Sequence, residues 1–175
     1  IRFDLSPDEY AAVITQAREG DWSPVQVTAY EQGDTSRFAV VLERGVQTQW
    51  LEKHLLTPQE FQDQFEAYLG QGFRPVSVAV SPVGEQPRVS AIWQKRGEAG
   101  WHLSTGVSPS AFSDLAAEYR DRTLHAASVS GIEVAGQTEY VVLWEAGPAE
   151  TEASLAVDPA RFREELGETF IATKG

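Results

Sequence analysis

The stretch Leu56-Thr57-Pro58-Gln59-Glu60-Phe61 decides the fold, because versions of it occur four times in a chain of 175 residues. Its threonine can accept a hydrogen bond from a free N–H group of a first helical turn, and proline suits the next position. The aromatic ring three residues after the proline begins the apolar face of a predicted helix. The other copies are Leu5-Ser6-Pro7-Asp8-Glu9-Tyr10, Val107-Ser108-Pro109-Ser110-Ala111-Phe112 and Val157-Asp158-Pro159-Ala160-Arg161-Phe162. Their capping residues are 51, 51 and 50 residues apart, which identifies a tandem repeat.

Each repeat unit predicts the same three parts, which are a short strand, a helix and a β-hairpin. In the second unit, Phe61, Phe65 and Tyr68 form the apolar stripe of the helix. The β-rich segments 73–80 and 88–94 are the two predicted strands of its hairpin. The predicted hairpin loops of the first two units are residues 31–36 and 83–87, which contain glycine and small polar residues.

The repeats predict one α+β domain over residues 1–175, with antiparallel hairpins packed against one helix per unit. A hairpin and a helix bury little surface alone, so neighbouring units must stack. Three full units cover about residues 1–50, 51–101 and 102–152, and a partial unit at 153–175 has a helix capped by Asp158 but no hairpin. The pattern leaves open whether the stack closes into a ring.

Alignment of the units predicts which positions form the core. Large apolar residues that recur at one position of the repeat most simply fill a shared interior. The aligned sets are Trp22, Phe73 and Leu124; Val25, Val76 and Ala127; Val27, Val78 and Val129; and Leu42, Trp93 and Trp144.

Composition narrows the function classes. The formal net charge of −12 argues against general binding to nucleic acid and against docking on anionic lipid, because both surfaces are negative. No run of about 18 apolar residues predicts a transmembrane helix. Cysteine, methionine and asparagine are absent, which removes the residues most prone to oxidation and deamidation. We therefore expect a secreted or cell-envelope location, and a chain that begins at Ile1 suggests processing or excision from a longer protein.

The second unit carries the most specific pattern, which is Leu56-Thr57-Pro58-x-x-Phe61, Gly72-Phe73-Arg74-Pro75-Val76-x-Val78, Ser90-Ala91-Ile92-Trp93 and then Trp101. This pattern resembles the bacterial tandem repeat domain family and is similar to the N-terminal domain of polyglycine hydrolases. The resemblance extends over nearly the whole chain. It implies a domain that occurs alone or beside a catalytic domain, often a β-lactamase-like serine hydrolase. The motif includes no catalytic residue, so the resemblance assigns none here.

No familiar catalytic or metal-binding motif stands out. None of the lysines Lys53, Lys95 and Lys174 follows a serine by three residues, so the Ser-x-x-Lys motif is absent, as is Gly-x-Ser-x-Gly. The histidines His54, His102 and His125 lack the spacing of a zinc site. We predict no catalytic residue, cofactor or metal. A degenerate hydrolase site built on His102 or His125 is kept as an alternative hypothesis.

Aromatic residues outside the predicted core suggest a binding surface instead. Trp50, Trp101, Tyr30 and His102 are the candidates for a ligand groove, because aromatic rings on a curved repeat surface suit sugars and extended peptides. Packing in the core is the alternative for the tryptophans. We therefore predict a non-catalytic module that binds a protein, peptide or glycan outside the cell or in the cell envelope. The alternative is an accessory or structural domain of a larger serine hydrolase whose catalytic part is absent from this chain.

Overall fold

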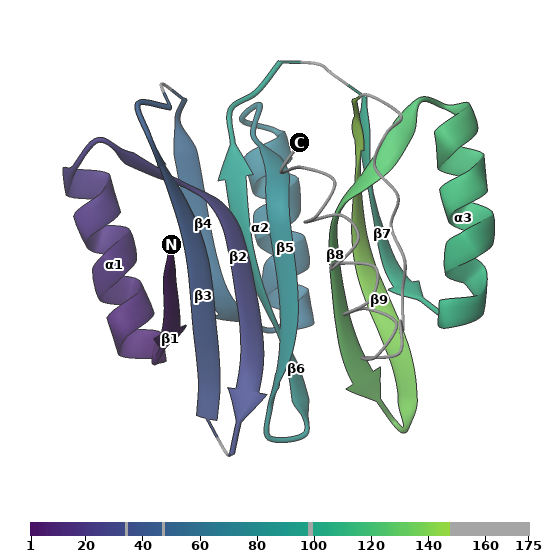
Figure 1. Cartoon of the computed structure of the whole chain (residues 1–175), viewed down its shortest axis with the longest axis horizontal. Coiled ribbons are helices and arrows are strands. Elements are labelled where there is room, and N and C mark those ends of the chain that lie inside the picture. The colour runs from purple at the N-terminus through teal and green to yellow at the C-terminus, as the bar shows by residue number, and fades with distance from the viewer. Residues whose placement is uncertain (34, 47, 98–99, 148–175) are drawn as a thin grey trace, which may run out of the picture.

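The computed structural model describes residues 1–33, 35–46, 48–97 and 100–147, and these form three strand–helix–hairpin units (Figure 1). The first unit contains β1 (Arg2–Leu5), α1 (Pro7–Glu19), β2 (Trp22–Gln32) and β3 (Thr35–Arg44). The second contains β4 (Trp50–Leu56), α2 (Pro58–Leu69), β5 (Arg74–Val83) and β6 (Gln86–Gln94). The third contains β7 (Trp101–Val107), α3 (Pro109–Asp121), β8 (Leu124–Val134) and β9 (Gln137–Ala146). The α+β tandem repeat is therefore confirmed, whereas the predicted helix at Asp158 lies outside the described residues.

The three helices begin where the sequence predicts. Ser6, Thr57 and Ser108 each accept a hydrogen bond from the backbone N–H three residues later. In α1 and α2 the bond is reciprocal, because the side chains of Glu9 and Glu60 accept from the backbone N–H of the capping residue at 2.8 Å. Two otherwise unpaired N–H groups are thereby satisfied at each of these two helix starts.

Each unit folds its strands into one antiparallel sheet, in the orders β1-β3-β2, β4-β6-β5 and β7-β9-β8. The hairpin loops are shorter than predicted. Strand β2 pairs with β3 as far as Gln32↔Thr35, and β5 pairs with β6 as far as Val83↔Gln86. Gly33 (φ 62°) and Gly84 (φ 60°) adopt the left-handed conformation that two-residue turns require. The predicted loops at 31–36 and 83–87 were thus too long.

A β-bulge recurs at one position in every unit. The register between the hairpin strands shifts at Pro24/Gln26, Pro75/Ser77 and Ala126/Ser128. Val25, Val76 and Ala127, which were predicted as core, are the bulged residues, and Ala127 is exposed. The position therefore marks a bend of the strand, and the core prediction is wrong for Ala127, whereas Val25 and Val76 are half-buried and Val76 packs against the core of the first unit.

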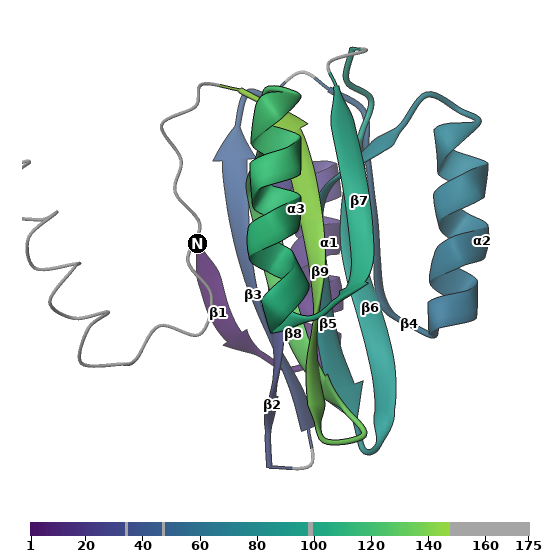
Figure 2. The same ribbon diagram turned by 90° about the vertical axis from the view of Figure 1, so that its right-hand side faces the viewer.

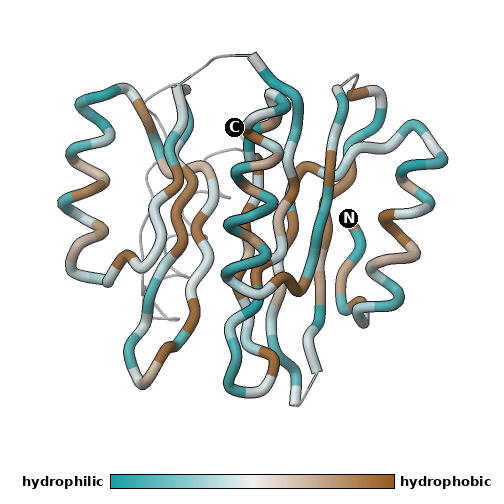
Figure 3. The backbone as a smooth tube through the Cα atoms, turned by 180° about the vertical axis from the view of Figure 1, so that it is seen from behind, coloured by the Kyte–Doolittle hydropathy of each residue, from teal (hydrophilic) through white to brown (hydrophobic). Residues whose placement is uncertain are grey.

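The units stack through their inner hairpin strands. β2 contacts β5, and β5 contacts β8. Figure 1 shows the three sheets side by side with α1 and α3 at the ends of the row, and the side view in Figure 2 shows α2 beyond β4 and β6. Figure 3 shows hydrophobic residues along the strands and mixed residues along the helices, as amphipathic helices require. The described residues do not show closure of the stack into a ring, which the sequence had left open.

Serine side chains connect the inner strands, which are the edges of their sheets. The hydroxyl of Ser77 accepts a hydrogen bond from Val27 N at 3.0 Å and donates one to Val27 O at 3.3 Å. The hydroxyl of Ser130 does the same for the N and O atoms of Val80, at 2.9 and 3.4 Å. Because a hydroxyl both donates and accepts, one serine satisfies two free backbone groups of the preceding unit.

Two of the three tryptophans that were predicted to lie in the core are buried, and the third is not. Trp93 and Trp144 are 0% and 1% exposed, each beside a tyrosine of its own helix. Trp22 was predicted as core but is 40% exposed. Its counterpart Phe73 lies beside Tyr68, with ring centroids 6.4 Å apart, whereas the first unit has Ala17 in place of that tyrosine. The missing ring leaves one side of Trp22 uncovered.

Candidate functional site

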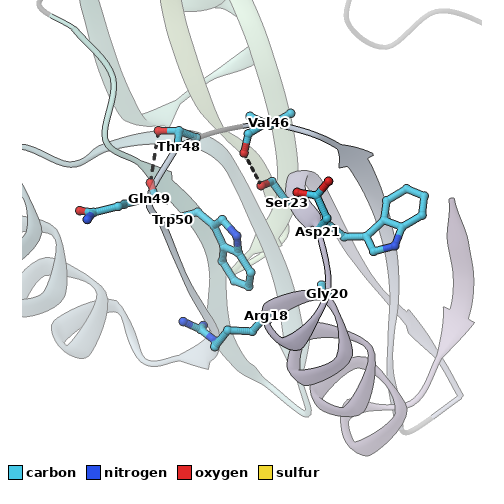
Figure 4. A pocket seen from close by; sticks show the side chains of 10 residues that line it. Arg18, Gly20, Asp21, Ser23, Val46, Thr48, Gln49 and Trp50 are labelled. Atoms are coloured by element: carbon cyan, nitrogen blue, oxygen red, sulfur yellow. Dashed lines mark hydrogen bonds between the residues drawn. The ribbon is translucent and has the colours of Figure 1, made fainter.

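A shallow pocket of about 290 Å³ lies where the first two units meet. The end of α1, the start of β2, the segment after β3 and the start of β4 form its walls (Figure 4). We call it the inter-unit pocket. Its lining includes Arg18, Asp21, Ser23, Thr48, Gln49 and Trp50.

Trp50 and Arg18 form the aromatic and cationic part of the inter-unit pocket. The guanidinium carbon of Arg18 lies 4.4 Å from the centroid of the Trp50 ring, and Figure 4 shows the two side chains next to each other. A cation at this distance is attracted to the electron-rich ring face, which holds both groups in place. Trp50 is half-buried, so part of the indole remains open to a ligand.

Hydrogen bonds hold the walls of the inter-unit pocket in position. Ser23 Oγ donates to Val46 O at 3.2 Å, and Thr48 Oγ1 donates to Lys95 O at 2.7 Å. Lys95 N in turn donates to Gln49 O at 2.9 Å, so the wall is attached to the end of the second hairpin. A pocket whose backbone is already ordered loses little conformational entropy when a ligand binds.

Three polar side chains of the inter-unit pocket are not used by these bonds. Within the described part of the chain, the side chains of Arg18, Asp21 and Gln49 form no hydrogen bond or ion pair with another residue. They offer a cation, an anion and an amide in a pocket that is also lined by the rings of Trp22 and Trp50. This combination can bind a ligand that has both polar groups and a flat or apolar face, such as a sugar or a peptide.

The other predicted groove residues lie in separate places. Trp101 occupies the equivalent position at the next unit boundary. Its ring lies beside Phe65, with ring centroids 6.1 Å apart, and, among the described residues, not beside a cation. His102 stacks on Tyr119 of α3 at 5.1 Å. The Tyr30 hydroxyl lies near the other end of β2 and donates to Asp4 Oδ1 at 3.5 Å. Neither Trp101, His102 nor Tyr30 lines the inter-unit pocket, so a groove that includes all four candidates stays a prediction.

Arg18 and Asp21 were not among the site residues predicted from the sequence. Arg18 follows Ile14 by one helical turn, on the side of α1 that faces the core. That spacing was a weak signal, because a basic residue near the end of a helix usually stabilises the helix dipole. Only the stacking of the second unit on the first brings Trp50 to Arg18.

A buried acid lies between the first two units. The side chain of Glu52 is 5% exposed, and its Oε1 lies 3.1 Å from Nδ1 of His54. The His54 ring meets the Tyr10 ring edge-on, with centroids 5.1 Å apart. Burial, followed by the charge of Glu52, raises the pKa of Tyr10, so this hydroxyl stays protonated and cannot act as a base near neutral pH. This cluster attaches α1 to β4.

A second polar network connects all three units. Arg74 and Arg96 each place a guanidinium nitrogen 3.9 Å from a carboxylate oxygen of Glu145. Arg96 Nε donates to Gln94 Oε1 at 2.7 Å, and Gln94 Nε2 donates to Pro24 O at 3.2 Å. The network therefore extends from the first unit to the third, and it orients the units relative to one another.

Elsewhere in residues 1–33, 35–46, 48–97 and 100–147, no group of three or more acidic, histidine or cysteine residues could hold a metal ion. In the same ranges, neither His102 nor the buried Nδ1 of His125 has a hydrogen-bonded partner. No described helix is long and apolar enough to cross a membrane.

Comparison with known families supports the resemblance in the sequence. A family model described as a polyglycine hydrolase-like structural repeat matches residues 1–45, 47–96 and 98–147. These three matches follow the three structural units and cover most of the chain. No curated protein matches the chain significantly. The chain belongs to the family of polyglycine hydrolase-like structural repeats.

Proposed function

We propose that this repeat domain is a non-catalytic module that binds a protein, peptide or glycan, outside the cell or in the cell envelope. The observation that carries the proposal is the inter-unit pocket, in which Arg18 and Trp50 are stacked and partly open. Tryptophan and arginine are the residue types that contribute most often to binding hot spots. The free side chains of Asp21 and Gln49 add polar groups that can orient a ligand.

The surroundings of the inter-unit pocket support binding rather than chemistry. The buried acid Glu52 is paired with His54, and the network of Arg74, Arg96 and Glu145 joins the units. These groups stabilise the stack, while the residues around Trp50 bond to little else. The net charge of −12 favours partners other than nucleic acid or anionic membranes, and the lack of cysteine, methionine and asparagine suits an oxidising location.

Titration calorimetry with envelope glycans and with a library of short peptides tests this proposal. We expect a ligand whose affinity falls at least about tenfold in Trp50→Ala, since truncation of a tryptophan at a binding hot spot costs about 2 kcal/mol or more. Trp101→Ala is the matched control, because it removes the same side chain from the equivalent position of the next unit boundary. Circular dichroism confirms that both variants fold. Equal losses in the two variants, or no ligand among these classes, would refute binding at the inter-unit pocket.

The second candidate function is that of an accessory or structural domain of a larger serine hydrolase. Membership of the polyglycine hydrolase-like repeat family favours it. The intact mass and gene context of the natural product test this candidate. A hydrolase domain in the same polypeptide supports it, and we expect removal of the repeat to reduce activity on polymeric substrates more than on small ones. Identical activity with and without the repeat would eliminate it.

A further inference from the structure

A second cavity, of about 280 Å³, lies inside the first unit between β1, α1 and the hairpin. Its apolar walls are Val13 and Ala17 of α1, Leu42 of β3 and the exposed ring of Trp22. Arg2 and Gln16 are at its rim. We call it the unit 1 cavity. It shares Ala17, Gly20 and Trp22 with the inter-unit pocket but does not include Arg18 or Trp50.

The repeat explains why the first unit is hollow here. In the second unit the corresponding space holds Tyr68 and Trp93, with ring centroids 5.1 Å apart. In the third unit it holds Tyr119 and Trp144, with centroids 4.7 Å apart. The first unit has Ala17 and Leu42 at these two positions of the repeat. Two smaller residues thus replace a packed aromatic pair, and both line the cavity.

We propose that the unit 1 cavity binds a small aromatic ligand that carries a carboxylate. The ring follows from the space, because the other two units fill it with aromatic side chains. The size agrees, since an apolar cavity of about 150 Å³ is enough to take up benzene. The proposal goes beyond the proposed function, because it concerns another site and a defined ligand chemistry.

The carboxylate follows from the charge at the rim. Arg2 is the only lining residue of the unit 1 cavity with a charged side chain, and within the described ranges it forms no ion pair. Its one hydrogen bond, at 3.4 Å, goes to the neighbouring carbonyl of Ile1. Acidic residues farther away than about 8 Å are screened at physiological salt, and Asp21, which lies between Gly20 and Trp22, lines the inter-unit pocket and not this cavity. A ring with a short acidic arm would reach both the apolar wall and Arg2.

Three indoles of different charge test the proposal by NMR titration of the full chain. Indole-3-propionate is the anion, indole is neutral and tryptamine is the cation. We expect shifts at the methyl groups of Ala17 and Leu42, with the anion binding at least threefold more tightly than indole and tryptamine binding most weakly. In Arg2→Gln the ring should still bind, but the preference for the anion should disappear.

The repeat itself supplies the control variant. Ala17→Tyr with Leu42→Trp rebuilds the aromatic pair of the other units, so we expect it to fold and to lose at least tenfold in affinity for all three indoles. Leu42→Phe alone fills part of the cavity and serves if the double variant does not fold. Indole binding that survives filling, or an anion that binds no better than indole, overturns the proposal. Trp50→Ala should leave indole binding unchanged, which separates this site from the inter-unit pocket.

Discussion

The serine bridge between the first two units allows a sharp test of what holds the stack together. Ser77 is 0% exposed, and its hydroxyl bonds to both the N and O atoms of Val27. Ser77→Ala removes both bonds and leaves two backbone groups of β2 away from water. An unsatisfied buried polar group costs about 1–3 kcal/mol. We therefore expect the free energy of unfolding to fall by about 2–4 kcal/mol.

The same strand offers a matched control. Ser81 lies four residues later on the same face of β5 and is 2% exposed. Its hydroxyl has no hydrogen-bond partner among the described residues. Ser81→Ala deletes the same oxygen at similar burial, but it removes an unsatisfied group rather than a bridge. We expect the stability of this variant to stay the same or to rise slightly.

Urea unfolding, followed by circular dichroism and by tryptophan fluorescence, measures both effects. The midpoint should fall in Ser77→Ala and should not fall in Ser81→Ala. A smaller slope in Ser77→Ala would show that the first unit now unfolds separately from the second. Equal midpoints for the two variants would refute the reasoning, because the loss would then come from the oxygen atom and not from its hydrogen bonds.

The remaining predictions concern the helix starts and the core. Thr57→Ala should lower the free energy of unfolding by about 1 kcal/mol in urea unfolding, because it removes the cap of α2. Trp93→Ala should cost about 3–5 kcal/mol, since the ring is fully buried beside Tyr68, and a loss below about 1 kcal/mol would contradict its place in the core. Hydrogen bonds from the backbone and side chain of Thr57 lower the pKa of Glu60 from its ordinary value of 4.5. The stability from Glu60 is therefore present above pH 4.5 and is lost as the pH falls through the lowered value. The difference between the urea midpoints of the native chain and Glu60→Gln should shrink on acidification, and a constant difference would contradict this.

Local signals made most of each unit predictable. A capping residue followed by proline specifies a helix start within a few positions, so Ser6, Thr57 and Ser108 could be identified without a structure. Burial of Trp93 and Trp144 followed from their recurrence in the return strand. The hairpin loops were harder, because polar residues near a turn look alike whether they belong to the loop or to the paired strand ends.

The contacts between units were not predictable, because they depend on side chains about 50 residues apart. Nothing in the sequence around Ser77 indicates that it bonds to Val27 instead of facing solvent. The same holds for the approach of Arg18 to Trp50, which depends on how β4 packs beside α1. The sequence pattern within a unit predicts the helix and strands of that unit. The candidate site lies at a boundary between units, which forms only when the units stack.

The boundaries differ in chemistry, and this leads to a prediction about the order of the units. At the first boundary, Glu52 and His54 of β4 pack against Tyr10 of α1, whereas the second boundary places Arg74 of the second unit beside Glu145 of the third. Exchanging the units would separate Arg74 from Glu145, and breaking a largely buried ion pair costs more than the intact pair contributes. A chain in which residues 47–96 and 98–147 are exchanged should therefore lose its cooperative unfolding transition and unfold at lower urea, although each unit keeps its own caps and hairpin. If the exchanged chain unfolds in one transition at the native midpoint, the polar residues do not determine the order, and apolar packing alone is sufficient.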